Sequence, residues 1–127
     1  MNIDGIMDFT SEDARKYEDD PSKTTTSAGE WFGGRYAEKK ELWKEASPIY
    51  YVNENSSAIQ FINGSMMRFH IGREEVIEKL KTYSIYSDIK TFDDAPHSFW
   101  LFEPWFEKTG KFVIEFLDQV LKTKDKK

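Results

Sequence analysis

The second half of the chain alternates between strand patterns and helix patterns. Residues 58–62 form a short apolar run, and residues 87–92 form a second, more polar strand pattern. A helix pattern follows each strand, over 73–83 and over 104–121. Strands alternating with helices of this length are typical of β-α-β units, in which a helix crosses over between two parallel strands. The order therefore predicts an α/β fold with a parallel sheet.

Each of the two helix patterns has one apolar face. In the first, Val76, Ile77, Leu80 and Tyr83 share that face, and Glu75 can pair with a lysine four positions on. In the second, Pro104 suits the first turn of a long helix. Its predicted core-facing stripe consists of Trp105, Thr109, Phe112, Val113, Phe116, Val120 and Leu121.

The first half of the chain is less regular. Residues 1–9 read as a strand end and a turn, and residues 10–47 read as a polar excursion with room for one short helix. A further helix is predicted over 36–46, because the residue before Pro48 is disfavoured in the helical region. Residues 48–122 carry the strand-helix-strand-helix pattern, and 123–127 form a charged tail expected to fray. The whole is predicted to be one domain.

Composition excludes several classes of function. With 18 basic and 23 acidic side chains, the net charge is −5, which argues against a broad phosphate-binding face and a nucleic-acid partner. No apolar run approaches the length of a membrane span, so no membrane partner is expected. The chain has no cysteine, hence no disulfide, thiol nucleophile or thiolate metal site. Residues 1–5 lack a signal-peptide pattern, and the compartment stays open.

Loops at the carboxyl ends of parallel strands are where functional residues gather. Three segments qualify, 5–10, 63–72 and 93–98, and the last two contain the only histidines, His70 and His97. His97 suits a general base, and the alternative is a loop histidine bonded to nearby backbone. His70 could anchor its own loop or contact a ligand, and the first interpretation is favoured. Two histidines and scattered acids do not form a metal motif, so we predict no metal and no cofactor.

Aromatic side chains are abundant, at 16% of residues. Trp31 and Trp100 are candidate substrate-binding surfaces, because flat aromatic faces stack on sugars and aryl groups, whereas core filling is the alternative for both and is favoured for Trp105. The pair Gly33-Gly34 lacks phosphate-loop spacing and indicates a turn. Ser65 follows a strand without the G-x-S-x-G pattern of a nucleophile elbow.

Several segments resemble the C-terminal part of α/β-hydrolases. They are 47–64, the run DAPHSFW at 94–100, and 112–121. Within that superfamily the chain looks most like the esterase/lipase branch that includes acetylxylan-type and related carbohydrate esterases. Residues 2–9 look like the sixth strand of the hydrolase sheet and its loop, and 31–48 like the excursion before the seventh. The resemblance implies the C-terminal half of a parallel α/β-hydrolase sheet, with about three strands and flanking helices.

By that resemblance His97 matches the catalytic histidine. The loop over 65–70, where the family commonly places the acid, has no carboxylate. Some hydrolases supply the acid after the sixth strand, which makes Asp8 the first candidate and Asp4 the second. Asp93 and its neighbour Asp94 are close to His97 in sequence, but adjacency alone does not bring a carboxylate to the distal ring nitrogen.

The resemblance implies part of a serine-type carboxylic-ester hydrolase acting on acylated carbohydrate or a similar small ester. The nucleophile elbow and oxyanion loop have no counterpart in this sequence, so we expect little esterase activity from the chain alone. The alternative is a non-catalytic binding or interaction protein derived from the hydrolase fold. An exposed strand edge is expected to favour self-association.

Overall fold

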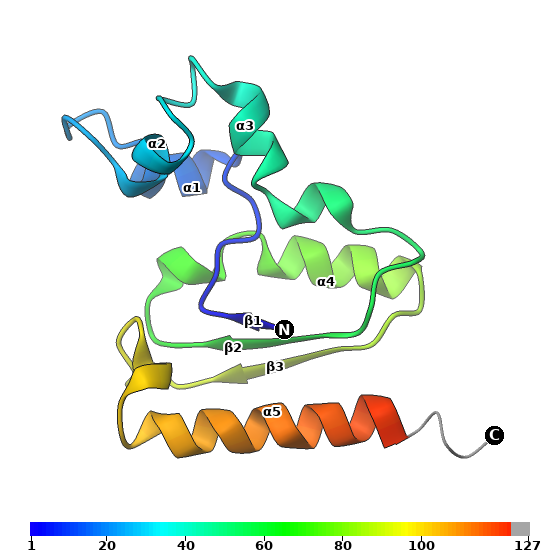
Figure 1. Ribbon diagram of the computed structural model, residues 1–127. Coiled ribbons are helices and arrows are strands. Elements are labelled where there is room, and N and C mark those ends of the chain that lie inside the picture. The colour runs from blue at the N-terminus through cyan, green and yellow to red at the C-terminus, as the bar shows by residue number, and fades with distance from the viewer. Residues whose placement is uncertain (123–127) are drawn as a thin grey trace.

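A parallel sheet forms the centre of the molecule (Figure 1). The computed structural model describes residues 1–122. Three strands, β1 (Asn2–Ile3), β2 (Ile59–Asn63) and β3 (Ser87–Thr91), lie in the order β1-β2-β3. Both pairs are parallel, with Phe61 opposite the first residue of β1 and Ile89 on its other side. The predicted α/β fold with a parallel sheet is confirmed.

Helices cover both faces of the sheet. Helix α4 (Arg73–Thr82) lies on one face and α5 (Trp105–Lys122) on the other (Figure 1). Successive residues of a strand point to opposite faces, and β2 therefore contributes to two cores. Phe61 packs with Val76 and Leu80 of α4, whereas Ile62 packs with Phe99 and its neighbours on the α5 side. Both β2 side chains are fully buried.

The part of the excursion before its last helix contains two short helices, whereas the sequence predicted one there. They are α1 (Glu12–Glu18) and α2 (Ser27–Trp31). The Ser11 and Thr26 hydroxyls cap them by accepting hydrogen bonds from the third backbone N–H beyond each cap. In Figure 1 this region lies beyond the α4 side of the sheet.

The excursion ends in α3 (Lys40–Glu45), which starts four residues later than the predicted helix over 36–46. Residues 36–38 form a turn instead. Trp43 is fully buried, and its indole N–H donates to the Gly34 carbonyl at 3.1 Å. The Ser47 hydroxyl accepts from the N–H of Phe9 at 2.8 Å. The Phe9–Ser47 hydrogen bond joins the two ends of the excursion, and the Trp43–Gly34 hydrogen bond holds α3 to the turn after α2.

Helix α5 is only partly covered. Of its predicted stripe, Thr109 and Phe116 are buried, but Leu121 is 59% exposed, so its assignment to the core was wrong. Tyr83, just past the end of α4, is likewise exposed rather than buried. The predicted fraying tail, 123–127, lies outside the described residues.

Three single 3₁₀ turns complete the described chain, at Pro48–Tyr51, Met67–His70 and Phe99–Leu101. The last two turns lie in the loops that follow β2 and β3. These two loops contain many of the side chains discussed below. In residues 1–122 no helix is long and apolar enough to cross a membrane.

Candidate active site

Asp4 is the first residue after β1, and its side chain is fully buried. Its backbone has φ 52°, in the left-handed region that aspartate tolerates better than most residues. Its N–H still donates to the Ile62 carbonyl at 2.9 Å, so the residue continues the ladder to β2. One carboxylate oxygen, Oδ1, accepts from the Gly64 N–H at 3.0 Å and lies 3.4 Å from the amide nitrogen of Asn63. The second oxygen is left free to face another group.

That group is His97, in the loop after β3. Its Nδ1 lies 2.9 Å from Asp4 Oδ2, although the two residues are 93 positions apart in sequence. The imidazole stacks on the Phe69 ring, with a centroid separation of 3.8 Å and an interplanar angle of 13°. Trp100 approaches from another side, edge to face at 5.3 Å. The three contacts fix the plane of the imidazole.

The Asp4–His97 pair has the geometry of an oriented base. A carboxylate only accepts hydrogen bonds, so in the neutral form of the ring Nδ1 carries the proton and Nε2 has the lone pair. The His97 side chain is 39% exposed, whereas that of Asp4 is inaccessible. Among residues 1–122, no hydrogen-bond partner contacts Nε2 of His97. This nitrogen can therefore take a proton from a group that approaches from outside.

Asp8, the first candidate for the acid, lies elsewhere. Its carboxylate accepts from the backbone N–H and the hydroxyl of Thr10, at 2.8 and 2.7 Å, and so closes a local turn. Asp94 accepts from the Trp105 indole at 3.2 Å. The structure brings Asp4 to His97, and it does not bring Asp8 there. The position of Asp4 in the sequence was the signal that favoured it over Asp8. Asp4 directly follows the strand, where functional residues gather, and Asp8 comes four residues later.

The loops after β2 and β3 approach each other closely at Gly64, which sequence reasoning did not single out. A Cβ at this position would meet the Ala95 carbonyl oxygen at 2.7 Å and the Phe99 ring at 3.2 Å. The next residue, Ser65, donates to the same carbonyl from both its N–H and its hydroxyl. His70 Nε2 lies 2.9 Å from the Gly64 carbonyl, in agreement with a loop-anchoring role.

Asn63 is a second residue that the sequence reasoning missed. Its amide nitrogen reaches both Asp4 and the Phe69 carbonyl, at 3.4 and 3.1 Å, and its oxygen accepts from Arg73 at 2.9 Å. One buried amide thus connects the acid to the residue that stacks on His97. Its position at the end of a buried strand was the only signal for it in the sequence.

The two tryptophans predicted to bind substrate are separated. Trp100 flanks His97, as described. Trp31 ends α2, is 86% exposed, and belongs to the excursion, on the side of the sheet opposite α5 and the loop that precedes it (Figure 1). Within residues 1–122 no group of three or more His, Asp or Glu side chains could hold a metal ion.

The comparisons with known proteins add no relative to this geometry. No family model matches the chain, and no curated protein or solved structure matches it. What the chain can do is therefore argued from the carboxylate–imidazole pair alone.

Proposed function

We propose that the chain supplies the acid–base part of a serine-type carboxylic-ester hydrolase. The observation that carries the proposal is the 2.9 Å contact between a buried Asp4 carboxylate and the Nδ1 of a partly exposed His97. This arrangement serves hydroxyl nucleophiles on several unrelated folds, because a weakly acidic alcohol needs an adjacent base to attack a carbonyl. The placement of both residues just after parallel strands supports the same conclusion.

The two residues divide the chemistry between them. Nε2 of His97 removes the proton of the attacking hydroxyl, whose oxygen bonds to the ester carbonyl carbon. The resulting imidazolium then returns the proton to the leaving alcohol as the acyl–oxygen bond breaks. Water repeats the sequence to release the acid. Asp4 stays ionised throughout, holds the ring in one tautomer and stabilises its positive charge.

The nucleophile is assigned to a segment outside the described residues. In residues 1–122 no hydroxyl contacts Nε2 of His97, and the nearby Ser65 hydroxyl is engaged with the Ala95 carbonyl. A second segment would therefore provide both the serine and the oxyanion donors. On this proposal the chain alone has little esterase activity.

For the substrate we propose an acylated carbohydrate or a similar small ester. Trp100 packs partly against the core on the α5 side, and its remaining exposed surface beside His97 suits the apolar face of a sugar or an aryl group. Met67, 70% exposed and two residues before Phe69, adds an adaptable apolar side chain to this edge of the sheet. Trp31 has no described ring contact with His97, so we do not give it this role.

The test begins with the DNA upstream of the Met1 codon. We expect an in-frame reading frame that encodes a G-x-S-x-G elbow. The upstream segment and this chain are then expressed together as one polypeptide, the joined protein. It is assayed with an aryl acetate, and the chain alone is the control. Activity in the longer protein that His97→Ala abolishes supports the proposal. Hydrolysis that survives His97→Ala would contradict it.

A second candidate is a binding protein that uses the aromatic surroundings of His97 to hold a ligand and catalyses no reaction. The absence of a hydroxyl at Nε2, within residues 1–122, favours it. A stop codon or an unrelated sequence upstream would select this candidate. So would a joined protein that binds an acylated sugar in calorimetry but does not cleave it.

A further inference from the structure

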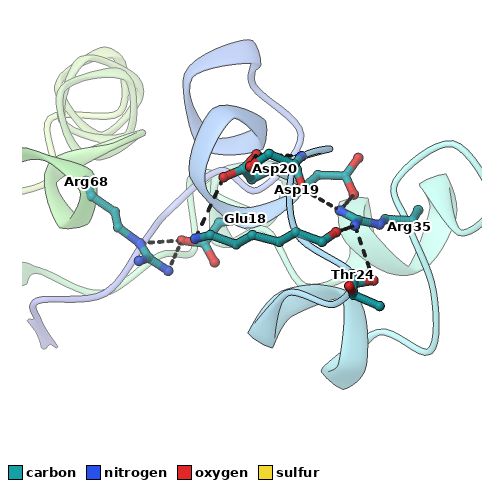
Figure 2. A network of polar contacts seen from close by, with 8 residues as sticks. Glu18, Asp19, Asp20, Thr24, Arg35 and Arg68 are labelled. Atoms are coloured by element: carbon teal, nitrogen blue, oxygen red, sulfur yellow. Dashed lines mark hydrogen bonds and ion pairs between the residues drawn. The ribbon is translucent and has the colours of Figure 1, made fainter.

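Two neighbouring acids at the end of α1 form ion pairs in opposite directions (Figure 2). Asp19 contacts Arg35 at 3.3 Å, and Arg35 also donates to backbone carbonyls of residues 20–24. That pair stays inside the excursion. Glu18 instead contacts Arg68, through Nε and Nη2, each 2.7 Å from one carboxylate oxygen. This second pair joins the excursion to the loop after β2.

Burial separates the two pairs. The Glu18 side chain is 5% exposed, compared with 18% for Asp19, whereas the two arginines are almost equally exposed, at 30% and 29%. A carboxylate withdrawn from water needs a partner, because an uncompensated buried charge is strongly unfavourable. Glu18 therefore holds Arg68 in place more strictly than Asp19 holds Arg35.

Arg68 is next to the residue that stacks on His97. Its guanidinium lies 5.2 Å from the centroid of the Phe69 ring, and that ring stacks on the imidazole at 3.8 Å. An unbroken series of contacts thus runs from Glu18 through Arg68 and Phe69 to His97. These contacts reach His97 from the excursion, and Asp4 takes no part in them.

Among the described contacts, the Phe69 ring is approached by the Arg68 guanidinium and the His97 imidazole. Phe69 belongs to the single 3₁₀ turn Met67–His70, in which no residue is buried. Asn63 and Gly64 hold the backbone and His70 of this turn, but they do not hold the Phe69 ring. Of the described polar contacts to the turn, only the one from Arg68 to Glu18 comes from the excursion.

We infer that Glu18 and Arg68 are positioning residues for His97. They fix the Phe69 ring against the imidazole, and so the excursion over 10–47 sets the orientation of the proposed base. The inference rests on the proposed function for its catalytic meaning. The contact series itself can be tested without any ester.

The experiment records the His97 ring-proton signals of the full chain by NMR. Protons above an aromatic face resonate upfield, so loss of the stack moves them downfield. Phe69→Leu defines the fully unstacked value. We expect Glu18→Gln and Arg68→Gln to move the His97 signals part of the way toward that value. Arg35→Gln, the matched control, breaks an equally exposed arginine pair at the same helix end and should leave them in place.

Glu18→Asp separates positioning from general damage, because it keeps a carboxylate for Arg68 and leaves the Arg68 guanidinium beside the Phe69 ring. Its His97 signals should lie closer to those of the wild type than the Glu18→Gln signals do, which a merely structural loss of packing would not explain. Arg68→Lys serves where a glutamine variant does not fold, and it should give signals between those of the wild type and Phe69→Leu. Unchanged His97 signals in the folded Glu18 and Arg68 variants, or equal shifts in Arg35→Gln, would overturn the inference. An inactive joined protein with the expected shifts would instead count against the proposed function alone.

Discussion

At the scale of single residues, Asp4 has two acceptor roles at once. Oδ1 receives the Gly64 N–H, and Oδ2 faces His97. A substitution that keeps the shape but replaces one oxygen by an NH₂ group cannot serve both. The chemistry of the pair therefore depends on the carboxylate rather than on the volume of the side chain.

Asp4→Asn should invert the His97 tautomer. The amide oxygen stays on the Gly64 N–H, so the NH₂ group faces Nδ1, which must then accept and leave the proton on Nε2. We expect ¹⁵N NMR of the chain to show this change, and kcat of the joined hydrolase to fall roughly 10⁴-fold. Asp8→Asn is the control, since an amide oxygen still accepts from Thr10. An equal loss in both variants would contradict the assignment of Asp4.

Gly64→Ala should destabilise the fold. The added Cβ meets a backbone oxygen at 2.7 Å, and two loops must separate to admit it. We expect a loss of about 1–3 kcal/mol in the free energy of unfolding, measured by urea titration. Gly110→Ala is the matched control, because nothing lies within 4 Å of its Cβ on exposed α5, and the helix should gain about 1 kcal/mol. A neutral Gly64→Ala would show that the loops are looser than their contacts indicate.

At the scale of elements, the short helices of the excursion depend on their caps. Helix α2 has five residues, too few to be stable by itself, and Thr26 caps it with a buried hydroxyl. Its last turn is closed by the N–H of Phe32, which donates to the Ala28 carbonyl at 2.8 Å. Phe32 in turn packs edge to face on buried Trp43.

Thr26→Ala should loosen α2 before it affects the sheet. Loss of an N-cap typically costs about 1 kcal/mol. We expect faster hydrogen exchange at the Phe32 amide and unchanged exchange at the Phe92 amide, which follows β3 and donates to the Asn63 carbonyl at 2.9 Å. Thr26→Ser keeps the hydroxyl and should preserve the protection of Phe32. Uniform acceleration in both regions would mean that the excursion and the sheet unfold as one unit.

At the scale of the whole molecule, the apolar surface is distributed unevenly. Helix α5 exposes Phe106, Ile114, Leu117 and Leu121, with exposed fractions from 40% to 62%. Their spacing places them on one side of the helix, next to the covered stripe. The outer edge of β1 has no neighbouring strand among residues 1–122. Apolar patches and open edges of this kind favour association.

The chain should therefore self-associate as its concentration rises. Sedimentation velocity is expected to show species larger than 15.0 kDa, and Ile114→Glu with Leu117→Glu should shift the population toward the monomer. Lys111→Glu changes the net charge by the same amount without touching the stripe, so it controls for simple repulsion. A monomer at every concentration would contradict the expectation.

Local patterns in the sequence predicted the second half of this fold well. Strands β2 and β3 and helices α4 and α5 follow from periodicities contained within each segment. The acid partner of His97 could not be predicted that way. It depends on how the sheet aligns the loops that hold Asp4 and His97, two residues 93 positions apart. The apolar pattern of α5 also gave a wrong prediction for one residue. Leu121 continues the stripe in sequence, but it is 59% exposed in the structure.

The order of the strands has a consequence for folding. Because β2 lies between β1 and β3, Asp4 and His97 meet only across the end of the central strand. A chain that has formed β2, α4 and β3 but not yet docked its first four residues has no acid at the imidazole. Contacts of such long sequence separation form slowly, since the intervening loop must close first. The tautomer of His97 therefore reports whether the first strand has docked beside β2.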